Sequence, residues 1–310
     1  MKSYSRFAKY FFLPSLAGFL LFASCETIIN PKLESTVPLL VIDAWLTNQP
    51  KEQRINLSQA QAYFDNSLPP AVSSASVSVK NETDGRVFNF NEKGKTGNYS
   101  WVPSNATDVI GKTGDQFSLS VMVGQDVYKA ISKMGRVPAI DSINFTFEKA
   151  RGFLPDYYNA QFWATDPKGK GDAYWIKAWR NDTLLLKPGE INLAFDAGFS
   201  ERGNIDGVTF ITPIRQGISP FDTDDNGTLL SPYNIGDSVY VEIHSLTVEA
   251  FDFLNEVVIQ TNRPGGFSEL FASPIANVST NISSTNPTGK KAVGFFNVGA
   301  VSWNGRRLKE

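Results

Sequence analysis

The chain has 310 residues, a formal net charge of −2 at pH 7 and 19% charged residues. This mildly acidic balance, without a basic run, argues against nucleic acid or anionic lipid headgroups as the main binding partner. The length suits two domains, and aromatic residues, at 13% of the chain, supply ample material for their cores.

The first 25 residues predict an exported lipoprotein. A short cationic start is followed by an uncharged, mostly apolar run over residues 11–23 and then by Cys25, the only cysteine. The apolar run is shorter than the ~20 residues that a membrane-spanning helix needs. We therefore expect a lipoprotein signal peptide over residues 1–24 and lipidation of Cys25. The alternative is an ordinary cleaved signal followed by an incidental thiol.

Lipidation fixes the expected location of the protein. Several acyl chains on one cysteine anchor a protein stably in a membrane. We expect a lipid-anchored protein of the cell envelope, at the outer membrane, on either its periplasmic or its surface face. Residues 25–36 are then the lipidated N-terminus and a spacer that contains a proline.

Residues 37–136 predict an immunoglobulin-like β-sandwich. About seven short runs of alternating or β-branched residues are separated by turn signals such as Asp84-Gly85. The Cys–Trp–Cys core of antibody domains is absent, so the expectation concerns the architecture alone. Strands are expected at residues 39–46, 75–80, 87–90, 97–101, 116–123 and 127–132.

Residues 137–310 predict a second β-rich domain that carries one α-helix. Pro138 marks the junction, because proline cannot donate to a central strand ladder. Thr247 as N-cap and an apolar stripe that includes Phe251 and Leu254 predict a helix over residues 247–262. The fold class is therefore mainly β. Strands are expected at residues 142–147, 174–180, 183–186, 208–211, 238–245 and 292–303.

The sequence contains few residues or motifs that could form a catalytic site. His244 is the only histidine, which excludes multi-histidine metal sites and the helical zincin motif. Alternation places His244 on the polar side of its strand, so we expect a surface residue. A carboxylate pair for glycoside hydrolysis stays open, because nothing singles out two of the many acidic residues. We assign no catalytic, cofactor-binding or metal-binding residue and expect no cofactor.

Residues 222–227 resemble the first half of a calcium loop. Asp222, Asp224 and Asn226 alternate, and a glycine takes the sixth position, but Tyr233 stands where a bidentate Glu belongs. A polar turn is the preferred interpretation.

Aromatic side chains are plentiful enough for a sugar or peptide platform. Alternation places Trp175 and Trp179 on one face of their strand. Core packing is the favoured interpretation for these residues, with ligand stacking as the alternative. The residues concerned are Tyr157, Tyr158, Phe162, Trp163, Tyr174, Trp175 and Trp179.

A series of loose, structural motifs spans nearly the whole mature chain. After Cys25 they occupy residues 40–47, 70–79, 84–85, 97–99, 137–143, 246–253, 272–282 and 293–297. Together they resemble a family of Bacteroidota lipoproteins known as domain of unknown function 4249. That family carries no agreed catalytic residues. Its members are often encoded beside TonB-dependent outer-membrane receptors, so the resemblance implies an accessory part in envelope uptake or assembly.

These observations lead to one hypothesis and two rivals. The hypothesis is a non-enzymatic, lipid-anchored envelope protein that binds a ligand or protein partner, as an accessory to an outer-membrane, TonB-dependent transport system. The rivals are an exported hydrolase that uses a carboxylate pair and a structural, adhesin-like module.

Overall fold

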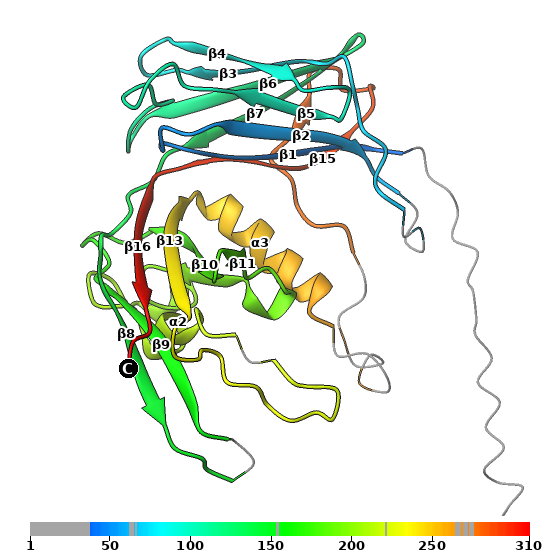
Figure 1. Ribbon diagram of the computed structural model, residues 1–310. Coiled ribbons are helices and arrows are strands. Elements are labelled where there is room, and N and C mark those ends of the chain that lie inside the picture. Colours follow the sequence, from blue (N-terminus) through cyan, green and yellow to red (C-terminus); the bar gives the residue numbers. More distant parts are fainter. Residues whose placement is uncertain are drawn as a thin grey trace, which may run out of the picture. The chain divides into compact units, whose positions relative to one another are not determined.

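Strands are the main regular elements of this protein, and helices are few (Figure 1). The computed structural model describes residues 38–61, 65, 67–152, 155–220, 222–263, 268, 272 and 276–310. The predicted signal peptide, Cys25 and the spacer to residue 36 lie outside the described residues. Within the described ranges, no helix is long and apolar enough to cross a membrane.

The first sheet has nine strands and curls around one core. Val298, in a strand at one end, donates its backbone NH to Ser132 Oγ near the other end, at 2.9 Å. Inward-facing side chains such as Ile42, Leu57 and Phe117 are fully buried. In order across the sheet, the strands are β14 (Ser283–Ser284), β7 (Asp126–Lys133), β6 (Gln116–Val123), β3 (Ser76–Asn81), β4 (Val87–Glu92), β5 (Asn98–Trp101), β2 (Gln53–Gln59), β1 (Leu40–Thr47) and β15 (Ala292–Gly299).

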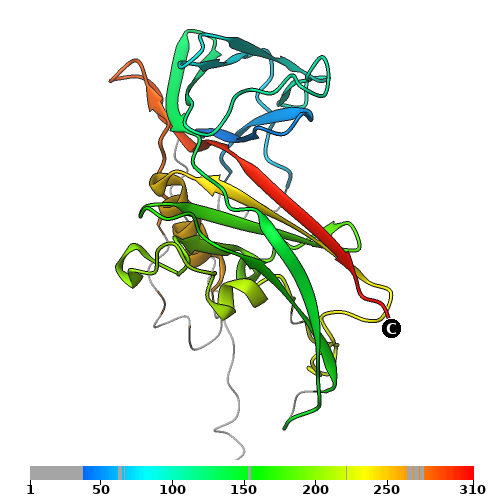
Figure 2. The ribbon, with the colours of Figure 1, turned by 90° about the vertical axis from the view of Figure 1, so that its left-hand side faces the viewer.

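The second sheet has five strands, all in antiparallel pairs, with a separate hairpin beside it (Figure 2). Its path runs β11 (Thr183–Leu184), β10 (Ala173–Arg180), β13 (Ser238–Leu246), β16 (Val301–Arg307), and β12 (Asn192–Phe195) also pairs with β10. The hairpin consists of β8 (Ile140–Glu148) and β9 (Tyr157–Ala164). The helices are α2 (Thr212–Gln216), α3 (Val248–Thr261) and the short 3-10 turns η1 (Pro188–Glu190) and η2 (Glu201–Gly203).

Each face of the second sheet borders an apolar core. On one face, Ile176, Val241 and neighbours pack with the β8–β9 hairpin and α2. On the other face, Phe251 of α3 packs with Phe195 of β12 and Phe295 of β15 in a smaller core. This smaller core joins the second sheet to the first.

The predicted fold class is confirmed: the protein is mainly β, with a sandwich-like first sheet and a second β-rich region that carries one long helix. The predicted helix is also confirmed. Thr247 Oγ1 accepts a hydrogen bond from the Ala250 backbone NH at 3.1 Å, which is the N-cap contact expected from the sequence.

The prediction of one final strand over residues 292–303 is wrong. The chain forms two strands, β15 in the first sheet and β16 in the second. They are separated at Ala300, whose backbone NH donates to Ser245 Oγ at 2.8 Å. Gly299 lets the backbones approach, because a Cβ there would lie 2.5 Å from the Ser245 carbonyl oxygen.

This crossing also changes the expected division of the chain at residues 136 and 137. The sequence assigned all of residues 137–310 to the second domain, yet β14 and β15 complete the first sheet. The expected strand at 208–211 is wrong too, because only an isolated bridge joins Thr165 and Thr209 before α2 begins. Strands β2, β9, β12 and β14 were not predicted. Polar side chains interrupt the apolar pattern of β2 and β9, and β12 and β14 are only four and two residues long.

Candidate functional site

One face of the second sheet carries polar and aromatic side chains where aliphatic ones are usual. Partners directly across antiparallel strands project from the same face. The alternate residues, such as Ile176 and Val241, face the opposite core. The cross-strand pairs on the polar face are Trp175–His244, Lys177–Glu242 and Trp179–Tyr240.

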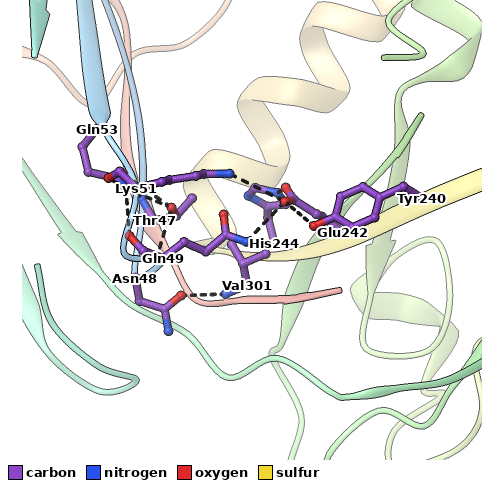
Figure 3. Close-up of polar contacts among 9 residues, drawn as sticks. All are labelled: Thr47, Asn48, Gln49, Lys51, Gln53, Tyr240, Glu242, His244 and Val301. Atoms are coloured by element: carbon purple, nitrogen blue, oxygen red, sulfur yellow. Dashed lines mark hydrogen bonds and ion pairs between the residues drawn. The ribbon is translucent and has the colours of Figure 1, made fainter. Parts of the chain in front are cut away.

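Glu242 and His244 form a buried pair on this face (Figure 3). His244 Nε2 lies 2.7 Å from Glu242 Oε2, and the residues are 8% and 4% exposed. A carboxylate only accepts hydrogen bonds, so Nε2 carries the proton and donates it. The expectation of a surface position for His244 is wrong. The turn between β1 and β2 covers the polar side of β13 at this point.

That turn, together with Tyr240 of β13, supplies further partners for the Glu242 carboxylate. Gln49 Nε2 donates to Glu242 Oε1 at 3.2 Å, and the Tyr240 hydroxyl donates to the same oxygen at 3.1 Å. Lys51 Nζ lies 3.6 Å from it. Together with His244, these groups compensate the loss of hydration that a buried carboxylate suffers.

The turn itself is held rigidly between the two sheets. Gln53 Oε1 accepts from the Thr47 backbone NH at 2.8 Å, and Gln53 Nε2 donates to the Lys51 carbonyl at 3.0 Å. On its other side, Asn48 Oδ1 accepts from the Val301 backbone NH of β16 at 3.0 Å. Figure 3 shows the turn, β13 and β16 meeting around this polar cluster.

The electrostatics of the pair follow from burial and from these contacts. Burial lowers the pKa of His244 to about 4, against the opposing effect of Glu242. Burial alone would raise the pKa of Glu242, but His244, Lys51 and Gln49 outweigh it and lower that pKa to about 2. At neutral pH the pair is therefore a neutral imidazole beside a carboxylate.

Lys177 lies on the same face, next to Glu242 in the cross-strand register. Its ammonium is 3.8 Å from the centre of the Trp175 ring, a cation–π contact. Burial lowers the pKa of Lys177 to about 8. Trp175 in turn meets Trp45 of β1 edge to face, with ring centres 5.5 Å apart.

A row of three aromatic rings continues along this face. The centres of Trp179 and Tyr240 are 5.3 Å apart, and those of Tyr240 and Trp303 are 5.8 Å apart. Trp303 is 61% exposed. Gly305 lies across from Tyr240 on β16, where a Cβ would only make an ordinary contact with the tyrosine ring, at 3.4 Å. We call Trp179, Tyr240 and Trp303 the aromatic row.

The aromatic residues singled out from the sequence do not form one platform. Phe162 and Tyr174 are fully buried, which agrees with the favoured core interpretation. Trp163 lies under the Arg215 guanidinium, 3.9 Å from its ring centre. The sequence interpretation missed Tyr240 and Trp303. For Tyr240 a signal was available, because it alternates in the sequence with valines that are buried on the opposite face.

Three carboxylates also come together, at Asp166, Asp172 and Asp196, with ligand oxygens within 4.8 Å of one another. Such oxygens suit a hard cation, but each carboxylate has protein partners. The Tyr174 hydroxyl donates to Asp166 at 2.6 Å, Arg136 pairs with Asp172 at 2.5 Å, and two backbone NH groups donate to Asp196. Arg136 supplies balancing charge, so the cluster is accounted for as a structural network.

The calcium-like loop at 222–227 forms a turn closed by a bridge between Thr223 and Leu229. Asp224 Oδ1 accepts from the backbone NH groups of Asn226 and Thr228, at 2.9 and 2.8 Å. The Asp222 carboxylate pairs with Lys187. These contacts are those of a polar turn.

A separate open groove of about 970 Å³ lies on the outer side of β3, β6 and β7 and reaches the start of α3. Its lining combines serine hydroxyls and charged side chains with exposed Val87 and Ile131, and Lys80 already pairs with Glu82 at 2.6 Å. It carries no aromatic ring, so the aromatic row is the stronger candidate for ligand contact.

Comparison with known proteins adds one finding. Residues 26–303 match the family model described as "Domain of unknown function (DUF4249)". No curated protein matches the chain.

Proposed function

Because the chain belongs to the DUF4249 family, whose description names no activity, we propose a function from the site and from the first 25 residues. The protein is a non-enzymatic, lipid-anchored protein of the cell envelope, at the outer membrane. It binds a ligand through the aromatic row, as an accessory to a TonB-dependent transport system.

The exposed aromatic row is the observation that carries the binding role. A tryptophan that is 61% exposed gives up most of the stabilisation that its burial would supply. Here Tyr240 adjoins it at 5.8 Å, and Trp179 adjoins Tyr240 at 5.3 Å. An exposed aromatic ring that two half-buried rings adjoin is the kind of surface found at ligand and partner sites.

The state of His244 supports a non-enzymatic role. A general base needs a pKa near the working pH and access to its substrate. The only histidine has a pKa of about 4, is buried, and already donates to Glu242. The clustered carboxylates do not favour the rival hydrolase either, because Asp166 and Asp196 are only 2% and 4% exposed.

The lipid anchor would place this binding surface next to partners in the membrane. An acylated Cys25 confines the protein to the plane of a membrane, which raises its effective concentration near membrane partners. A ligand held on the aromatic row is thereby kept close to a transporter in the same membrane.

Co-purification tests this function. A C-terminally tagged full chain is expressed in a Bacteroidota host and purified from detergent-solubilised membranes. We expect a β-barrel receptor to co-purify in stoichiometric amount, and the Cys25→Ser variant to leave the membrane fraction. Recovery of the chain alone, together with turnover of a panel of glycans, would instead establish the exported hydrolase.

A further inference from the structure

We propose that the ligand of the aromatic row is an acidic polysaccharide, whose sugar rings stack on Trp303 and the adjoining Tyr240 while its carboxylates meet the neighbouring cations. This inference rests on the proposed binding function and specifies the class of ligand.

The charges that this face offers to solvent are mainly cationic. Lys51 has a side chain that is 55% exposed, Arg307 is exposed at the end of β16, and half-buried Lys177 places its ammonium over the Trp175 ring. The Glu242 side chain is only 5% exposed and is occupied by protein partners. Asp43 of β1, which is exposed, is the acidic group of the first sheet that acts on Lys177, and the three cations Lys51, Arg307 and Lys177 outnumber it. A local cationic surface on a chain with net charge −2 points to an anionic ligand.

The rings favour a sugar chain as the anionic ligand. The C–H groups on one side of a pyranose ring form a flat apolar surface that packs against an aromatic ring, while its hydroxyls stay available to polar groups. The planes of Tyr240 and Trp303 differ by 34° and their centres are 5.8 Å apart, so neighbouring sugars of one chain can contact these two rings. Trp179 meets Tyr240 edge to face, at 65° and 5.3 Å, and ends the row. Aromatic surface with a few placed polar groups is the usual composition of such sites.

The size of the row argues against a protein as the principal ligand. A stable protein interface buries about 800 Å² on each partner, whereas a fully exposed aromatic side chain offers only about 150–250 Å². Trp179 and Tyr240 are already largely covered by their neighbours, and Trp303 alone is mostly exposed. The row therefore supplies too little apolar surface for the centre of a protein interface.

Lys177 is the residue that distinguishes an acidic from a neutral sugar, because the strand register places it on the same face as Trp179 and, through Glu242, in line with Trp303. Burial lowers its pKa to about 8, so its ammonium has lost part of its hydration. A carboxylate beside it replaces that hydration with a charge-assisted hydrogen bond. A neutral hydroxyl at the same place replaces it less well.

Biosensor binding of the full chain, purified in a non-ionic detergent, tests the inference. The immobilised probes are polygalacturonate, alginate and hyaluronate, each beside its carboxyl-reduced form, which keeps the backbone and removes the charge. We expect at least one acidic form to bind about tenfold more tightly than its reduced counterpart. Trp303→Ala should lower that affinity about tenfold or more. Lys177→Met should abolish the preference for the acidic form, and Lys177→Arg should keep it.

Matched variants serve as controls. Trp163→Ala removes another partly exposed tryptophan, and Lys129→Met removes an exposed lysine of the first sheet. Neither should change binding. Unfolding midpoints confirm that each variant is folded.

Three results would overturn the inference. In the first, the acidic and reduced forms bind equally well and Trp303→Ala abolishes both. The aromatic row would then be a sugar site without a preference for acidic sugars. Binding that is insensitive to both Trp303→Ala and Lys177→Met would place the ligand elsewhere. Failure of every acidic polysaccharide to bind, with Trp303→Ala disrupting receptor co-purification, would make the row a protein contact.

Discussion

His244 Nε2 lies 2.7 Å from Glu242 Oε2, and both side chains are buried where the β1–β2 turn covers β13. The two residues are separated by one position in the sequence, and Gln49 and Lys51 of the β1–β2 turn add further contacts to Glu242. The pair therefore links the first sheet to the second through ionisable groups.

Acid should destabilise the protein through this pair. Burial lowers the pKa of His244 from 6.5 to about 4. Between these two pH values the imidazole is protonated in the unfolded chain but stays neutral in the folded chain. This contribution to the free energy of unfolding is fully present above pH 6.5 and is lost as the pH falls towards 4. The loss is on the order of 3 kcal/mol. Glu242, lowered from 4.5 to about 2, adds a loss of the same sign below pH 4.5.

Urea unfolding between pH 7.5 and 4 measures this effect. His244→Gln keeps a donor for Glu242 but does not titrate, so the variant should lose the pH dependence between 6.5 and 4. The clustered aspartates remain in both proteins, and their contributions cancel in the comparison. Identical pH profiles for the two proteins would show that His244 does not titrate on unfolding.

Gly294 should be among the positions that tolerate alanine least. Its φ is +98°, and a Cβ there would lie 2.1 Å from the Ile42 carbonyl oxygen of the adjacent strand. Gly236 has nearly the same φ, +97°, but open space around the added atom. We expect Gly236→Ala to cost about 1–2 kcal/mol from backbone strain, and Gly294→Ala at least about 2 kcal/mol more. Equal unfolding midpoints would show that β15 shifts freely away from β1.

Two tryptophans should respond differently to removal. Trp45 contacts Trp175, Phe253 and Phe295 in the core that joins the sheets, so Trp45→Ala should destabilise the protein by about 3 kcal/mol or more. Trp303 is mostly exposed, so Trp303→Ala should cost no more than about 1 kcal/mol. Thermal unfolding of both variants checks this. A large loss in Trp303→Ala would assign the aromatic row to stability instead of binding.

Local patterns in the sequence predicted the local parts of this fold. Strand β6 occupies Gln116–Val123, as expected, because Phe117, Leu119 and Val121 alternate without interruption. Helix α3 begins after Thr247, because a capping hydroxyl and an apolar stripe coincide there. Both signals lie within a few residues of one another in the chain.

Long-range pairing is what the sequence could not supply. Leu40 of β1 pairs in parallel with Ala292 of β15, far away in the sequence, and no local pattern specifies this pairing. Alternation correctly placed Glu242 and His244 on one side of β13, but it could not reveal that the turn at Gln49 covers that side. Burial of the only histidine followed from that cover.

The most direct test of the account is the chemistry at the start of the mature chain. Mass spectrometry of the protein extracted from envelope membranes should find Cys25 as the first residue, carrying acyl chains. An unmodified thiol at the processed terminus, or an intact leader on protein retained in the cytosol, would contradict the proposal of a lipid-anchored binding protein.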